Sequence, residues 1–86
     1  MKNIEEVVMK IHTEIMHQKG IEKKSTLDME IRPQNGITSE SIVIFILNLE
    51  DELNIELDDF LPQIRKVKTI RGLADIVNKA YSNHNV

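Results

Sequence analysis

A serine at the start of the most apolar stretch of the chain is the side chain best placed to carry chemistry. The turn Gly36-Ile37-Thr38-Ser39 leads directly from a long polar segment into this stretch. A Ser at such a position usually caps a helix. The same position also tolerates a phosphate ester, because free N–H groups and the helix dipole favour an anion there. The pattern therefore suits Ser39 to the attachment of a phosphate-linked prosthetic arm.

The other reactive side chains do not form a catalytic constellation. The chain has no Cys, which excludes a thiolate nucleophile and a cysteine zinc site. His12 and His17 are five residues apart, out of register for two metal ligands on one helical face. We expect both to be surface histidines, with His84 in a C-terminal tail. The consecutive acids at 50–52 would point in different directions on a helix, which disfavours a cation site. We expect neither an enzyme nor a bound metal.

Charge is distributed unevenly along the chain, whose 11 basic and 14 acidic residues give a net charge of −3. No Lys or Arg occurs from Pro33 to Ile64, and the acids there predict a face that meets basic partners. Nucleic acid is disfavoured, because the bases at 65–71 form only a small cluster and aromatic residues make up 3% of the chain.

The length of 86 residues predicts one domain, residues 1–86, with a thin core. The longest apolar run, Ile42 to Leu47, is six residues, too short for a membrane span. The N-terminal segment MKNIEEVVMK has acids where a signal peptide needs an apolar block. We therefore expect a cytoplasmic protein, and we expect it to be a monomer.

Apolar spacing predicts three long helices, over residues 4–16, 39–54 and 70–81. In each segment the apolar side chains repeat at offsets 0, 3, 4, 7 and 11, which is one face of a helix. Each segment follows a residue type that caps helices, namely Asn3, Thr38 or Ser39, and Thr69.

A weaker apolar pattern over residues 58–66 predicts a short third helix with Pro62 in its first turn. Residues 20–38 are predicted to form a long loop, and 82–86 a polar tail. The side chains expected to pin the loop to the core are Leu27 and Ile31. The fold expected is an all-α, small four-helix bundle with three long helices and a short third one.

The chain resembles the acyl carrier protein family over nearly its whole length, from Ile4 to about Tyr81. In that family a Ser at the start of helix two, in the motif Gly-x-Asp-Ser-Leu, bears 4′-phosphopantetheine. The family's Leu-Glu-Glu-Glu-Phe-x-x-Glu-Ile is similar to Leu49-Glu50-Asp51-Glu52-Leu53-Asn54-Ile55-Glu56-Leu57 here. The start of its last helix is similar to Thr69-Ile70-Arg71 through Ile76-Val77. The chain departs from the family at three positions. Thr38 replaces the Asp, Glu40 replaces the Leu, and Ile44 replaces a mid-helix acid.

Two serines compete for the place of the modified residue. Ser39 keeps the family's spacing to the apolar positions of helix two. The tripeptide Glu40-Ser41-Ile42 is more similar to Asp-Ser-Leu, but it requires a two-residue deletion in the helix that follows. Register favours Ser39, and Ser41 is its rival.

The resemblance implies a carrier that holds acyl intermediates as thioesters on a 4′-phosphopantetheine arm derived from coenzyme A. It would shuttle them between enzymes of fatty-acid, polyketide or related biosynthesis. The implied partners are a phosphopantetheinyl transferase and acyl-transferring or condensing enzymes with basic docking patches. Candidate docking residues are Glu40, Ile44, Glu50, Asp51 and Glu56. Candidate residues for an acyl-chain pocket inside the bundle are Ile42, Phe45, Ile46 and Leu49.

Three further apolar residues of the second helix, Val43, Ile44 and Leu47, would either add an apolar docking contact or pack under the loop and the third helix. Two alternatives to the acyl carrier stay open. One is an aminoacyl or peptidyl carrier of the same fold. The other is an unmodified helical adaptor, which the altered residues around Ser39 would permit.

Overall fold

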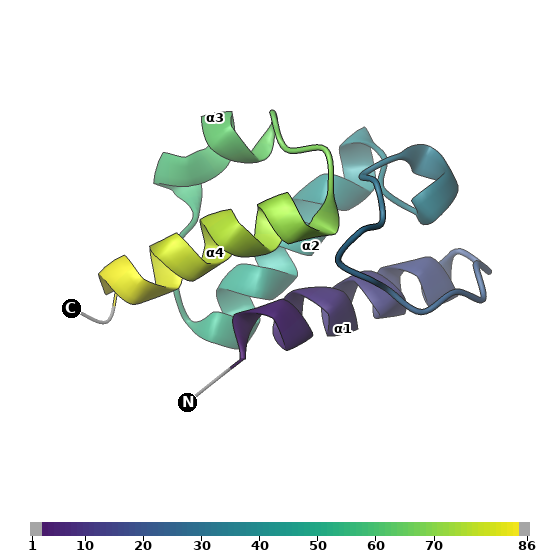
Figure 1. Cartoon of the computed structure of the whole chain (residues 1–86), viewed down its shortest axis with the longest axis horizontal. Coiled ribbons are helices and arrows are strands. Elements are labelled where there is room, and N and C mark those ends of the chain that lie inside the picture. The colour runs from purple at the N-terminus through teal and green to yellow at the C-terminus, as the bar shows by residue number, and fades with distance from the viewer. Residues whose placement is uncertain (1–2, 85–86) are drawn as a thin grey trace.

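This computed structural model describes residues 3–84, and the chain forms four α-helices within this range (Figure 1). The helices are α1 (Ile4–Gln18), α2 (Ser39–Leu53), α3 (Leu61–Ile64) and α4 (Ile70–His84). Two short 3₁₀ turns, η1 (Pro33–Asn35) and η2 (Asp58–Phe60), precede α2 and α3. Within this range there is no strand, only an isolated bridge between Glu30 and Thr69. The expected small all-helical bundle, with three long helices and a short third one, is confirmed.

Side chains that the sequence marks as caps begin the three long helices. The Asn3 side chain accepts a hydrogen bond from the Glu6 amide, and Thr38 accepts one from the Ser41 amide. The Thr69 hydroxyl accepts from the Gly72 amide in the first turn of α4. Each of these bonds satisfies an amide that has no partner within its own helix.

The end of α4 corrects one expectation. Residues 82–84 were expected in a polar tail, but α4 continues through His84. Polar side chains do not end a helix, and no Gly or Pro follows Tyr81 to stop it. Asn85 and Val86, the rest of the expected tail, lie outside the described residues.

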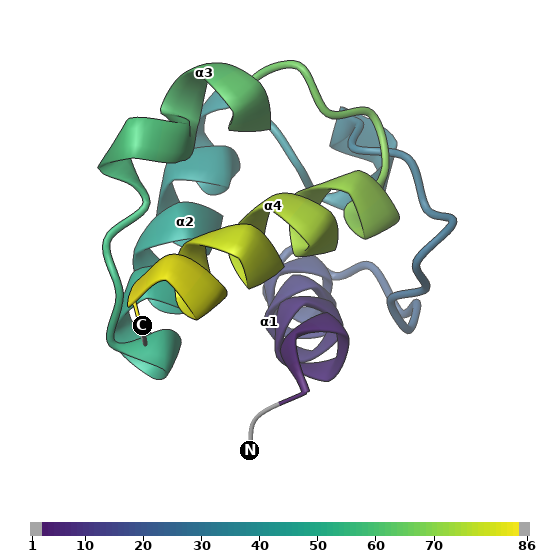
Figure 2. The same cartoon turned by 60° about the vertical axis from the view of Figure 1, so that its left-hand side comes forward.

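The core lies where α1 packs against both α2 and α4. Each long helix turns the stripe that its apolar spacing predicts toward the core. The fully buried members include Val8, Phe45, Leu49, Leu73 and Val77, whereas Val7, Ile42, Ile46 and Tyr81 are only partly buried. Figure 2 shows α1 and α3 on opposite sides of α2 and α4. The arrangement leaves one flank of α2 facing α3 across a groove and its outer flank uncovered.

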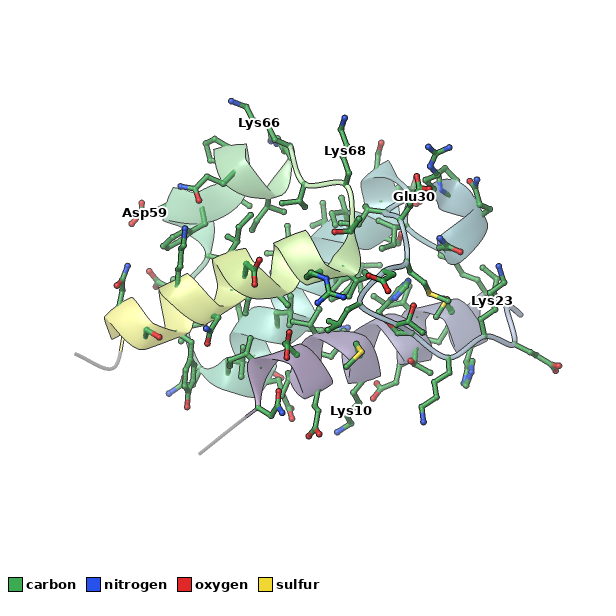
Figure 3. The ribbon with its side chains drawn as sticks, in the orientation of Figure 1. Lys10, Lys23, Glu30, Asp59, Lys66 and Lys68 are labelled. Carbon is green, nitrogen blue, oxygen red and sulfur yellow. The ribbon has the colours of Figure 1, made fainter. Side chains whose placement is uncertain are left out.

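The long loop between α1 and α2 is fastened to the start of α4. The Ile31 amide donates to the Lys68 carbonyl at 2.8 Å, and the Ile70 amide donates to the Met29 carbonyl at 2.9 Å. Leu27 and Ile31 pack on the core, as expected. Figure 3 shows Lys66 and Lys68 projecting outward on the side where Glu30 of the loop lies. The loop is therefore an ordered part of the bundle.

Across residues 3–84, none of the helices is long and apolar enough to cross a membrane.

Candidate functional site

Ser39 is exposed, and it is the first residue of α2. It lies on the wall of a groove with a volume of about 670 Å³ between α2, α3 and the neighbouring loops. Most of the lining is aliphatic, with Thr38, Ser39, Asp58 and Arg65 as its polar members. The aliphatic lining consists of Ile31, Ile37, Ile42, Val43, Ile46, Leu47, Leu61, Ile64 and Val67. A group attached to the Ser39 hydroxyl would therefore start next to an apolar groove.

Ser41 occupies a different environment, although it lies only two residues further along. Ser41 is buried, with only 3% of the residue exposed to solvent. Its hydroxyl donates to the Gly36 carbonyl at 2.7 Å and accepts from the Thr38 amide at 2.7 Å. Together with the bond from the Ser41 amide to the Thr38 hydroxyl, these contacts form a reciprocal capping box. The Ser41 hydroxyl thus holds the start of α2 in place.

We expect Ser41→Ala to lower the free energy of unfolding by about 1–2 kcal/mol, because the Gly36 carbonyl and the Thr38 amide lose their partner. Ser39→Ala is the matched control. It alters an exposed hydroxyl and should change the free energy of unfolding by no more than about 0.5 kcal/mol. Urea unfolding followed by circular dichroism measures both variants. Equal losses for the two would contradict the capping role of Ser41.

The four residues expected to shelter an acyl chain separate into two pairs. Ile42 and Ile46 line the groove beside Ser39. Phe45 and Leu49 are fully buried and belong to the core. Phe45 and Leu49 therefore lie inside the bundle, as expected, but they do not line the groove.

The outer face of α2 is apolar at its centre and acidic at both ends. Val43, Ile44 and Leu47 are 54%, 51% and 57% exposed, so the α1–α2 loop and α3 leave them largely uncovered. Glu40 and Asp51 are exposed, and their spacing from Ile44 and Leu47 places these four side chains on one helical face. We call this set, Glu40, Val43, Ile44, Leu47 and Asp51, the outer α2 face. Val43 and Leu47 also border the groove, but the loop and α3 leave all three apolar side chains more than half exposed.

The other two acids expected in docking differ from Glu40 and Asp51. Glu50 is half-buried, and its carboxylate accepts a hydrogen bond from the Leu57 amide at 2.8 Å. It therefore fixes the connection that leaves α2 at Asn54, whose backbone is left-handed with a φ of 54°. Glu56 is exposed but lies on that connection, beyond the end of α2.

His12 corrects a second expectation, because it is buried and not a surface histidine. Its Nδ1 lies 2.7 Å from the Ser25 hydroxyl, and its Nε2 lies 2.9 Å from the Asn35 carbonyl oxygen. Its ring stacks on Phe45 with a centroid separation of 5.9 Å. Burial lowers the pKa of His12, and the hydrogen bond to the Asn35 carbonyl partly opposes this shift. The sequence feature that could have indicated this burial is the position of His12, which lies one helical turn from the buried residues Val8 and Met16.

The other histidines carry less information. His17 is exposed, as expected, and His84 ends α4. No cluster of three or more His, Asp or Glu residues among positions 3–84 is arranged to hold a metal ion.

Comparisons of the chain with protein-family models, with curated proteins and with solved structures find no match.

Proposed function

We propose that the chain is an acyl carrier protein, with 4′-phosphopantetheine attached to Ser39 and acyl intermediates held on that arm as thioesters. The observation that carries this proposal is the contrast between the two serines. Ser39 is exposed beside an apolar groove, whereas the Ser41 hydroxyl is buried and hydrogen-bonded on both sides. A modifying enzyme can reach Ser39 without breaking the start of α2, which it could not do at Ser41.

The attachment step needs only one reactive group from this chain, the Ser39 hydroxyl. Its oxygen attacks the phosphorus of coenzyme A that bears pantetheine, and a P–O bond forms as the phosphoanhydride bond breaks. The nucleotide bisphosphate leaves, and the hydroxyl proton passes to a base of the transferase. Free N–H groups in the first turn of α2 favour the phosphodiester that results. Once attached, the arm supplies the thiol that this cysteine-free chain lacks, while the protein supplies presentation.

The groove supports the proposal that the cargo of the carrier is apolar. Its volume of about 670 Å³ and its mainly aliphatic lining suit the burial of hydrocarbon. Ile42 and Ile46 are the residues in it that the family resemblance also marks for this role. Shelter of the chain between enzymes would keep it from water while the carrier diffuses.

The outer α2 face is the surface we propose for docking. Glu40 and Asp51 would steer basic patches of a phosphopantetheinyl transferase and of acyl-transferring or condensing enzymes. Exposed ion pairs contribute only about 0–1 kcal/mol each, so docking should be weak and salt-sensitive. Such binding suits a monomeric cytoplasmic carrier that visits several enzymes of fatty-acid, polyketide or related biosynthesis.

Intact-protein mass spectrometry tests the proposal. Wild type, Ser39→Ala and Ser41→Ala are incubated with coenzyme A and a broad-specificity phosphopantetheinyl transferase. We expect wild type and Ser41→Ala to gain the mass of one phosphopantetheine and Ser39→Ala to gain none. Loss of the addition only in Ser41→Ala would move the site to Ser41. No addition to any of the three would overturn the carrier function.

One observation favours an unmodified adaptor as the second candidate. Val43, Ile44 and Leu47 are each more than half exposed on one helix, and a protein partner could cover them. Isolation of the unmodified chain from a host with an active transferase would favour this candidate. An aminoacyl or peptidyl carrier would use the same Ser39 and differ only in its cargo, which mass spectrometry of the trapped thioester identifies.

A further inference from the structure

His12 connects three parts of the bundle through its ring. Its own helix is α1, its two nitrogens contact Ser25 and Asn35 of the α1–α2 loop, and its ring face stacks on Phe45 of α2. The Asn35 carbonyl oxygen only accepts hydrogen bonds, so Nε2 must carry a proton and donate it. In the neutral ring Nδ1 then accepts from the Ser25 hydroxyl. Both nitrogens are therefore satisfied when His12 is uncharged.

The segment that leads into Ser39 is held at two adjacent carbonyls. His12 of α1 binds the Asn35 carbonyl at 2.9 Å, and Ser41 of α2 binds the Gly36 carbonyl at 2.7 Å. Gly36 also lies directly on α1, since a Cβ added there would be 3.3 Å from Cγ of Met16, one turn beyond His12. The position of Ser39 therefore depends on α1 as well as on the cap of its own helix.

We propose that neutral His12 is a positioning residue for Ser39. By holding the Asn35 carbonyl against α1, it fixes the segment that delivers Ser39 to the start of α2, and protonation of its ring loosens that segment. What Ser39 does rests on the proposed function. The positioning itself is a property of the unmodified chain, and it can be measured without any transferase.

Protonation is unfavourable in this environment because the charge has no counter-ion. The contacts of the ring are a hydroxyl, a carbonyl and an aromatic ring. A proton on Nδ1 would also force the Ser25 hydroxyl to turn and give up its present bond. None of these contacts is with a charged side chain, and the charged residues next in sequence to the contacting segments, among them Lys10, Glu14, Lys24 and Arg32, are exposed.

The direction of the pH effect follows from this environment. Burial lowers the pKa of His12 from 6.5, whereas a solvated histidine keeps its ordinary value. A loosened state that exposes the ring therefore binds a proton more readily than the closed state. Stability is complete above pH 6.5 and is lost as the pH falls below 6.5 toward the lowered pKa. The closed segment should accordingly open at mildly acidic pH.

Amide hydrogen exchange of the full unmodified chain, resolved by NMR between about pH 8 and about pH 5, tests the proposal. The reporters are the amides of Gly36 and Ile37, which donate to the Pro33 and Arg32 carbonyls at 2.9 and 3.1 Å. We expect their protection factors to fall as His12 titrates. The amide of Val77 in α4 is the reference, and its protection factor should not change in parallel.

Three variants separate positioning from simple core packing. His12→Gln does not titrate but keeps a donor for the Asn35 carbonyl, so it should keep the protection without its pH dependence. His12→Leu loses the donor and should lower the protection of Gly36 and Ile37 about tenfold at every pH. His17→Gln changes an exposed histidine of the same helix and should match wild type. If His12→Leu does not fold, the wild-type and His12→Gln profiles still decide the question.

Two results would overturn the proposal. One is protection at Gly36 and Ile37 that does not depend on pH in wild type. The other is a loss that Val77 shares equally, which would make His12 a core residue without a positioning role.

Loading by the transferase is measured separately at about pH 8, where His12→Leu should reduce kcat/KM about tenfold through misplacement of Ser39. If the transferase loads neither wild type nor any variant, the proposed carrier function is wrong. The hydrogen-exchange data still test the positioning role of His12 in that case.

Discussion

Replacement of Phe45 by Ala should lower the free energy of unfolding by about 3–5 kcal/mol. Phe45 is fully buried and is the largest of the completely buried side chains of the described residues. It lies on the inner face of α2, and its ring stacks on His12 of α1. The truncation removes apolar burial and leaves a cavity where α1 and α2 meet. It also removes the surface that covers the His12 imidazole.

Urea unfolding measured by circular dichroism checks this loss. A domain of 86 residues has a free energy of unfolding of roughly 4–13 kcal/mol, so the loss should be a large fraction of the total. Ile44→Ala is the matched control, because Ile44 precedes Phe45 on the same helix and is 51% exposed. It should cost no more than about 0.5 kcal/mol. Similar losses for the two variants would refute this assignment of the inner and outer faces of α2.

The three long helices could be predicted from the sequence because each buries one stripe. Their predicted starts at 4, 39 and 70 agree with the structure. A capping residue and the first apolar side chain together mark a start. The apolar pattern of the first helix fades at Gln18 to Gly20, and α1 ends at Gln18. The end of the last helix was less accurate, because α4 continues to His84, beyond the last side chain of its stripe. An apolar stripe marks the part of a helix that packs against the core, and the helix can continue beyond that part.

The contacts of His12 could not be deduced from local pattern in the same way. Its partners Ser25 and Asn35 are 13 and 23 residues away along the chain. Only the path of the loop brings a hydroxyl and a carbonyl to the two ring nitrogens. The register with Val8 and Met16 would have indicated a buried position, although not its hydrogen-bond partners.

The same limit applies to the candidate site. The sequence left Ser39 and Ser41 as rivals, because Ser39 keeps the spacing of the family that the chain resembles, whereas Glu40-Ser41-Ile42 is more similar to its Asp-Ser-Leu motif. Their difference depends on the Gly36 carbonyl, which the turn before α2 brings to Ser41. Attachment at Ser39 stays a prediction, supported by its exposure. Glu50 differs in a similar way from Asp51, because its bond to the Leu57 amide depends on the turn after α2.

Gly36→Ala should lower the free energy of unfolding by about 2–3 kcal/mol. Gly36 has a φ of 81°, in the left-handed region, where an L-residue costs about 1–2 kcal/mol. The new methyl group would also be 3.3 Å from Cγ and 3.5 Å from Cα of Met16, which is fully buried. The Met16 side chain must move by a few tenths of an ångström, and the core around it resists this movement.

Gly20→Ala provides a control with the same backbone and no steric contact. Gly20 has a φ of 80°, and a Cβ added there would meet nothing within 4 Å. It should cost only the left-handed conformation, about 1–2 kcal/mol. The difference between the two variants, measured by urea unfolding, therefore reports the contact of the Asn35–Thr38 segment with α1. Equal losses would mean that this segment accommodates a methyl group and is not clamped against Met16. A larger loss at Gly36 should be accompanied by slower loading of Ser39, which Gly20→Ala should leave unchanged.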